Sequence, residues 1–249
     1  MDYGFDFSFI GEFWPSLLEG LWVSTRMAAV SLTGGFILGV LLAVARSQDS
    51  GPIRRLAGGF VDLTRNTPLI VQTFWLFFGL SALEIRVPAF YAAVIALAIN
   101  TSGYTCEIVR AGMDSVHHGQ KEAAACLGLS KARILRHVVL PQAIEKMYPS
   151  LISQFVLMML ATSIMSEISV EELTAIGYQI QSQTFRGFEA YLVIAAIYLA
   201  MSWLLRVVMT LCYNVAFPKQ RHIDQARSAG SRQARDKALS GTAMNGAKS

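Results

Sequence analysis

The chain has 249 residues, of which 53% are hydrophobic and only 15% are charged, with a formal net charge of +4. Soluble globular domains average about 45–50% apolar and about 25% charged residues, so this balance argues against an ordinary water-soluble domain. The apolar residues fall in long runs rather than in periodic stripes. A membrane protein is therefore the first interpretation.

The N-terminal segment, residues 1–20, precedes the first long apolar run. It contains Asp2, Asp6 and Glu12 but no basic residue. A secretory signal peptide begins with a positively charged region, so this segment does not resemble a cleavable one. We expect it to remain outside the membrane, on the periplasmic side.

Five segments qualify, or nearly qualify, as membrane spans, which need about 20 mostly apolar residues. In chain order they run from about Leu21 to Ala45, Leu56 to Leu83, Pro88 to Ile108, Tyr148 to Ser166 and Tyr191 to Phe217. The second is the weakest, because its uninterrupted apolar part begins only at Leu69 and Pro68 favours a kink there. In the first span, Gly35 and Gly39 form a small-xxx-small pair that is typical of close helix–helix packing.

Lysine and arginine residues predict the orientation, because they accumulate in loops on the cytoplasmic side. Most of the 21 basic residues lie in three regions, from Arg46 to Arg65, from Arg110 to Lys146 and from Lys219 to Lys248. Five crossings with the N-terminus outside and the C-terminus inside place all three regions on one side. The predicted fold is an all-α membrane protein with five transmembrane helices.

The tail, residues 218–249, is rich in Ala, Ser, Gly, Arg and Lys and has no apolar period. Such a composition does not bury enough apolar surface to fold, so we expect a disordered cytoplasmic extension. Attraction of its basic residues to anionic lipid is the alternative.

The longest predicted cytoplasmic loop, about residues 111–146, carries strong local signals. The run from Glu122 to Leu127 favours a helix, and Gly128 stands where a helix ends in the left-handed conformation. Ser130 is a good N-cap for a second helix, and Pro141 marks where that helix bends or stops. These signals predict two short helices with an alanine-rich surface, and an ordinary amphipathic surface helix is the alternative.

The same stretch resembles the EAA signature of the membrane subunits of ABC importers, which reads E-A-A, three residues, G, nine residues and I-x-L-P. The matching residues are Glu122, Ala123, Ala124, Gly128, Leu140 and Pro141. Val138 stands in place of the isoleucine. In that family this element is a coupling helix that docks into a cleft of the ATP-binding subunit. The resemblance implies that these residues couple the chain to a separate ATPase.

Further motifs, spread over about Gly20 to Phe217, are similar to the polar amino acid uptake branch of this family. The segment from Arg65 to Gln72 resembles its R-x-T-P-x-x-V-Q motif. Polar residues within apolar helices face either a cavity or a neighbouring helix, and helix–helix contact remains the alternative for each of them here. The candidate residues of a translocation path are Thr67, Gln72, Asn100, Tyr104, Thr162, Ser163 and Glu167.

The fourth span departs from this branch, which usually has K-D-T-S-L where the chain has the five residues from Leu160 to Ile164. The hydroxyl groups remain, the charged pair is absent, and Glu167 stands where an apolar residue is usual. A carboxylate is costly in a membrane unless it is paired or wetted. We expect Glu167 at the outer mouth or along the path, where it shifts transport toward cationic or unusual amino acid derivatives. The alternative is a solvated periplasmic loop that also holds Glu171 and Glu172.

Other kinds of site find no support in the sequence. It lacks the G-x-x-x-x-G-K-[ST] phosphate loop, so ATP and Mg are expected at a partner ATPase and no cofactor at this chain. His117 and His118 are adjacent and do not face one another on a helix, so no metal site is expected. The main competing class is an ion-coupled secondary carrier, but the inverted repeats of such carriers are not seen.

The resemblance implies the type I importer permease fold, with one transmembrane domain over residues 21–217, in a bacterial inner membrane. It implies that the chain is not an enzyme and forms half of the path for a polar amino acid, or for an opine or other amino acid derivative. The expected partners are a second permease subunit, identical or related, a pair of ATPase subunits and a periplasmic substrate-binding protein. No nucleic acid partner is expected.

Overall fold

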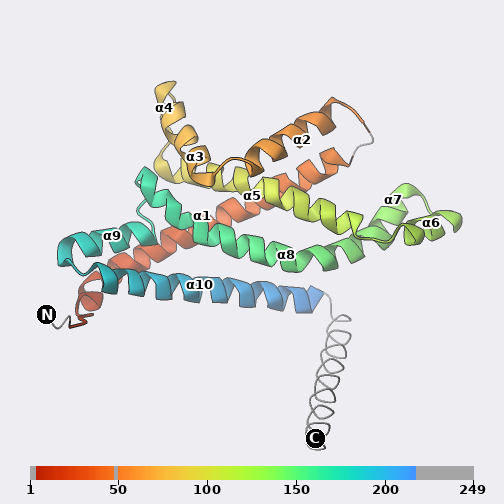
Figure 1. Ribbon diagram of the computed structural model, residues 1–249. Coiled ribbons are helices and arrows are strands. Elements are labelled where there is room, and N and C mark those ends of the chain that lie inside the picture. Colours follow the sequence, from red (N-terminus) through yellow and green to blue (C-terminus); the bar gives the residue numbers. More distant parts are fainter. Residues whose placement is uncertain (1–3, 48–49, 217–249) are drawn as a thin grey trace, which may run out of the picture. The chain divides into compact units, whose positions relative to one another are not determined.

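The computed structural model describes residues 4–47 and 50–216. Within these residues the backbone is helical apart from turns and short connections, and it forms no strand (Figure 1). The chain divides into two units, Met1–Arg206 and Val207–Ser249, and the described part of the second unit is the end of one helix. The predicted disordered tail, residues 218–249, lies outside the described residues.

The helices include short stretches of π or 3-10 geometry, which carry the label η. In chain order they are α1 (Phe9–Arg46), α2 (Pro52–Arg65), α3 (Leu69–Phe74), η1 (Trp75–Gly79), α4 (Leu80–Ala82), α5 (Ala89–Asp114), α6 (His118–Cys126), α7 (Lys131–Ile134), η2 (Leu135–Val139), α8 (Leu140–Leu160), η3 (Ala161–Ile168), α9 (Leu173–Thr184) and α10 (Gly187–Ala216).

Four helices in the described part are long and apolar enough to cross a membrane. They are Phe9–Arg46, Ala89–Asp114, Lys131–Ile168 and Gly187–Val215. These helices correspond to the first, third, fourth and fifth predicted spans. The apolar helix Leu69–Ala82, which corresponds to the end of the second predicted span, is shorter.

The predicted continuous second span, from Leu56 to Leu83, is wrong. Its first part belongs to α2, which ends at Arg65, and a separate apolar helix begins at Leu69. Pro68 has extended backbone angles, φ −61° and ψ 140°, and a proline disfavours helical geometry in the residue before it. The chain is therefore broken between α2 and α3, not merely kinked.

The first helix begins at Phe9, so much of the predicted outside segment, residues 1–20, is helical. Phe9, Phe13 and Leu17 are buried in one cluster with residues of α9 and α10. Burial of large apolar side chains is the main stabilising term in helix packing. These tertiary contacts extend the helix beyond the apolar run that the sequence marks.

Helices α1 and α5 approach each other closely at two glycines of α1. A Cβ atom on Gly35 would lie 2.5 Å from Thr101 Cβ and 2.7 Å from the Ala98 carbonyl oxygen, and one on Gly39 would lie 2.5 Å from Thr105 Cβ. Small residues permit such an approach of two backbones. The predicted role of Gly35 and Gly39 in close helix packing is confirmed.

Helix α9 was not predicted from the sequence, and a buried glutamate caps its N-terminus. Oε1 of Glu172 accepts hydrogen bonds from the amides of Thr174 and Ala175 at 2.8 and 3.0 Å. Its Oε2 accepts from the hydroxyl groups of Ser24 in α1 and Tyr198 in α10. Glu172 is 0% exposed, so its interpretation as a solvated loop residue is wrong. The four hydrogen-bond donors take the place of water around the carboxylate.

Glu172→Gln is expected to remove a pH dependence of stability. Burial raises the pKa of the Glu172 carboxyl above its ordinary value and outweighs the four hydrogen bonds that lower it. The corresponding stability is fully present below the ordinary pKa and is lost as pH rises through the raised pKa. As pH rises above the ordinary glutamate pKa, the wild-type melting temperature in detergent should therefore fall relative to that of the variant. Glu171→Gln, at an exposed neighbour, is the control, and a parallel pH profile for wild type and Glu172→Gln would contradict the prediction.

Candidate coupling loop and translocation cavity

The predicted coupling loop begins with α6, which ends in a tight turn at Gly128. The amide of Gly128 donates to the Ala125 carbonyl at 2.9 Å, and the amide of Leu129 donates to the Ala124 carbonyl at 3.2 Å. These two bonds form a Schellman motif, in which the residue after the helix is left-handed. Gly128 has a φ of +77°, which a Cβ atom would oppose. The predicted turn geometry at Gly128 is confirmed.

Helix α6 offers a surface of small side chains. Ala123 and Ala125 are exposed, whereas Ala124 is buried. Leu127, at the end of the helix, is 82% exposed. Glu122 is exposed and lies 3.0 Å from His118, one turn earlier. Short side chains beside an exposed leucine are suited to the groove of a partner protein.

The second helix of the loop does not stop at Pro141. Helical backbone continues from Lys131 to Ile168, with π geometry from Leu135 to Val139 and Leu140 and Pro141 at the start of α8. A proline lacks the N–H that an α-helical turn would use, and the π turn before it accommodates the missing bond. The last two residues of the EAA signature therefore belong to a long apolar helix.

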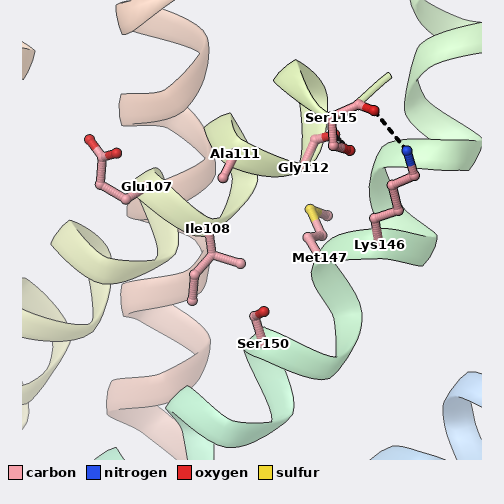
Figure 2. A pocket seen from close by; sticks show the side chains of 8 residues that line it. All are labelled: Glu107, Ile108, Ala111, Gly112, Ser115, Lys146, Met147 and Ser150. Carbon is pink, nitrogen blue, oxygen red and sulfur yellow. Dashed lines mark hydrogen bonds between the residues drawn. The ribbon is translucent and has the colours of Figure 1, made fainter. Parts of the chain in front are cut away.

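Apolar and polar contacts fix the loop to the end of α5. Val116, Val139 and Ala143 are buried together, and Lys146 Nζ donates to the Ser115 carbonyl at 2.7 Å. Figure 2 shows this bond beside a cavity of about 370 Å³ between α5 and α8. These contacts hold the loop against the ends of two long helices.

The coupling to an ATPase that the EAA resemblance implies predicts that Lys146→Met lowers the amount of substrate transported per ATP hydrolysed by roughly fivefold, the effect of about 1 kcal/mol from one lost hydrogen bond. The reason is that α8 would lose its bond to the C-cap residue of α5, so that a movement of α8 would be passed less fully to α5. Lys146→Arg should restore the ratio, and Arg55→Met, at an exposed arginine of α2 outside the loop, should leave it unchanged. A transport-to-hydrolysis ratio in Lys146→Met equal to that of wild type would refute this role.

A second cavity, of about 580 Å³, lies between the α2–α3 bend, α5, α8 and η3. Its polar lining comes from three of these elements and consists of Arg65, Asn66, Thr67, Asn100, Tyr104 and Gln154. Three of the predicted path residues, Thr67, Asn100 and Tyr104, are thus brought together. Gln154 was not predicted, although a buried amide in an apolar helix is itself a signal of a cavity or a helix contact.

Gln72 lies beside this cavity and holds the bend between α2 and α3. Its amide nitrogen donates to the Thr64 carbonyl at 2.7 Å and to the Thr67 hydroxyl at 2.7 Å. Its oxygen accepts from the Asn100 amide at 3.3 Å. Gln72 therefore positions two lining residues, while its own amide is engaged in the bend.

The remaining predicted path residues do not line this cavity. The hydroxyl groups of Thr162 and Ser163 donate to carbonyls of their own helix, Met159 and Leu160, at 2.7 and 2.8 Å. Glu167 is exposed. Their place in a translocation path stays a prediction.

Three arginines surround Glu107 next to the cavity. Arg46 and Arg110 form ion pairs with its carboxylate, and Arg65 Nη1 lies 3.8 Å from its Oε1. The guanidinium carbon of Arg65 also lies 5.6 Å from the centroid of the Tyr104 ring. This cluster ties together α1, α2 and α5 at one end of the cavity.

Long apolar helices, a protruding helical loop fixed to two of them and a partly polar cavity between them define a membrane transport subunit. The chain belongs to the family described as binding-protein-dependent transport system inner membrane component, which matches residues 35–222. It is thus a permease component of a bacterial inner membrane transporter, and its role is transport rather than catalysis.

Several relatives cover most of the chain. It is 33% identical over 207 residues to the glutamine transport system permease protein GlnP of Escherichia coli, covering 82% of this chain and 94% of the relative. It is 32% identical over 227 residues to the octopine transport system permease protein OccM of Rhizobium radiobacter, with 88% and 93% covered. A crystal structure of an amino acid ABC transporter with histidines matches with a TM-score of 0.79 and 36% identity, over 84% of this chain and 98% of that chain.

Proposed function

We propose that the chain forms half of the translocation path of an ATP-driven importer for a polar amino acid. The cavity of about 580 Å³ carries this proposal, because it combines a guanidinium, amides and two hydroxyl groups with an apolar wall. Such groups together suit the carboxylate, the ammonium group and a polar side chain of an amino acid. An opine is the second candidate, because one relative is named for octopine transport.

Five crossings, with the N-terminus outside and the C-terminus inside, are the proposed topology. The four long helices supply four crossings, and Leu69–Ala82 supplies the fifth. A helix of about 14 residues is about 21 Å long, which is less than the thickness of the bilayer core, about 30 Å. Leu69–Ala82 alone is therefore too short to cross the core. We propose that the bend at Pro68 supplies the rest of the crossing and that α5 supports this segment.

We also propose that α6 and the Gly128 turn dock onto a partner ATPase, which uses ATP and Mg. Of the residues in the EAA signature, Glu122, Ala123, Ala124 and Gly128 belong to α6 and its turn, while Leu140 and Pro141 begin α8. Docking of the ATPase at α6 and its turn would pass movement through η2 to Leu140 and Pro141 at the start of α8. A second permease subunit, identical or related, completes the path, and a periplasmic binding protein delivers the ligand.

Uptake by the reconstituted importer tests the proposal. The chain with its partner subunits would be placed in proteoliposomes with the binding protein and labelled arginine, glutamate, glutamine and octopine. The expected result is saturable uptake of one of them that is lost without ATP. Uptake that runs on a proton or sodium gradient without ATP would identify an ion-coupled carrier and overturn the proposal.

A further inference from the structure

Arg65 is the one charged side chain that lines the proposed translocation cavity within the described residues. It lies in the last turn of α2, and its polar neighbours in the lining include Asn66, Asn100 and Gln154, whose amides are neutral. A single fixed cation in a cavity of neutral groups attracts anionic groups and repels cationic ones. At this wall of the cavity, Arg65 therefore favours the carboxylate of an amino acid over its ammonium group.

The guanidinium of Arg65 has unused hydrogen-bond donors. A guanidinium carries five N–H donors, and in residues 4–47 and 50–216 Arg65 contacts Glu107 only at 3.8 Å, beyond hydrogen-bonding distance. Its other contact is the Tyr104 ring, 5.6 Å away, which is within cation–π range. The ring stabilises the guanidinium at the cavity wall and leaves the N–H groups available to a ligand.

Glu107 is already satisfied without Arg65. Its Oε1 pairs with Arg46, and its Oε2 accepts from the Nε and Nη2 of Arg110 at 3.2 and 2.9 Å. Arg110 also pairs with Asp114 at 2.8 Å. Removing one partner of a buried ion pair is costly when it leaves a charge uncompensated. Arg65 can leave this cluster without that penalty, because Glu107 keeps two arginines.

We propose that Arg65 binds the carboxylate of the transported amino acid in exchange for its contact with Glu107, and that Tyr104 holds the guanidinium in place. The inference rests on the proposed function and adds that imported compounds bear a free carboxylate. Arginine–carboxylate pairs are charge-assisted and often bidentate. Asn100 and Gln154 then remain for the ammonium group and the side chain of the substrate.

Ligand binding to the importer without its binding protein tests this directly. The permease–ATPase complex in nanodiscs would be given labelled L-glutamine or L-arginine, with the unlabelled amino acid or its α-carboxamide as competitor. The carboxamide keeps the ammonium group and side chain but lacks the negative charge. We expect it to compete at least about tenfold more weakly, because one charge-assisted hydrogen bond contributes about 1.5–3 kcal/mol.

In Arg65→Gln the ratio between acid and carboxamide is expected to fall toward one, and Arg65→Lys should restore part of it. The matched control is Arg55→Gln, at an exposed arginine on the same helix and outside the cavity. A merely structural role of Arg65 would weaken both competitors equally and leave the ratio unchanged, which would overturn the inference. Failure of the wild-type complex to bind either amino acid would also overturn it, whereas absence of any ATP-dependent uptake would overturn the proposed function instead.

Discussion

Gly128→Asp is expected to reduce ATP-dependent uptake by at least about tenfold while the chain still folds into the membrane. Gly128 has φ +77°, and a Cβ atom placed on it would meet no atom within 4 Å of the chain itself. The substitution therefore creates no clash within the subunit, but it adds backbone strain of about 1–3 kcal/mol and a negative charge at the proposed docking turn. The measurement is substrate uptake per ATP hydrolysed in proteoliposomes.

The matched control is Gly59→Asp, which places the same charge at an exposed glycine of α2 with equally open surroundings. It should retain uptake. Gly128→Ala, which adds the strain without the charge, should fall between wild type and Gly128→Asp. Wild-type uptake in Gly128→Asp would remove Gly128 from the coupling element, even though its left-handed turn would stand.

Gly35→Val is expected to destabilise the fold strongly. Its Cβ would lie 2.5 Å from Thr101 Cβ and 2.7 Å from the Ala98 carbonyl oxygen, and the second of these is backbone that cannot move without shifting α5. Overpacking of a close contact typically costs about 1–3 kcal/mol and sometimes more, which is a large part of a total stability of about 5–15 kcal/mol. The yield of monodisperse protein in detergent and its melting temperature measure the effect.

Gly34→Val is the sharp control, because it makes the same change one residue earlier. A Cβ on Gly34 would meet only Ala98 Cβ, at 4.0 Å, so this variant should keep the wild-type stability or gain slightly, because valine has a higher helix propensity than glycine. Equal losses of yield and melting temperature in the two variants would show that close packing with α5 does not govern this part of α1.

The coupling loop illustrates what local sequence can predict. The left-handed turn at Gly128 follows from the missing Cβ and from the helix-forming run before it, and both act within a few residues. The prediction of one continuous second span was wrong at Pro68. The proline itself was visible in the sequence, but a proline is compatible with either a kink or a full break of the helix. A proline restricts its neighbour, and in the folded chain Gln72 stabilises the full break by bonding to Thr64 and Thr67 across the bend.

The candidate cavity was predicted in part. Asn100, Tyr104 and Thr67 stood out as polar residues near or within apolar helices, and the structure brings them together. Arg65 was recognised as part of a motif, but its position at the cavity wall follows from the α2–α3 bend. Thr162 carried the same sequence signal, yet its hydroxyl is satisfied by the carbonyl of Met159. A polar residue in an apolar helix does not reveal whether its partner is a ligand or its own backbone.

By itself, the sequence determined the all-helical class, the four long apolar helices of the described part, the turn at Gly128 and the close-packing face at Gly35 and Gly39. All of these depend on hydrophobicity or on sterics over a few residues. Only the tertiary structure decided that Glu172 is buried between α1, α9 and α10, and that Arg46 and Arg65 meet Glu107. The physical reason is that a charged side chain looks the same in sequence whether water or a distant partner satisfies it, and only the fold supplies that partner.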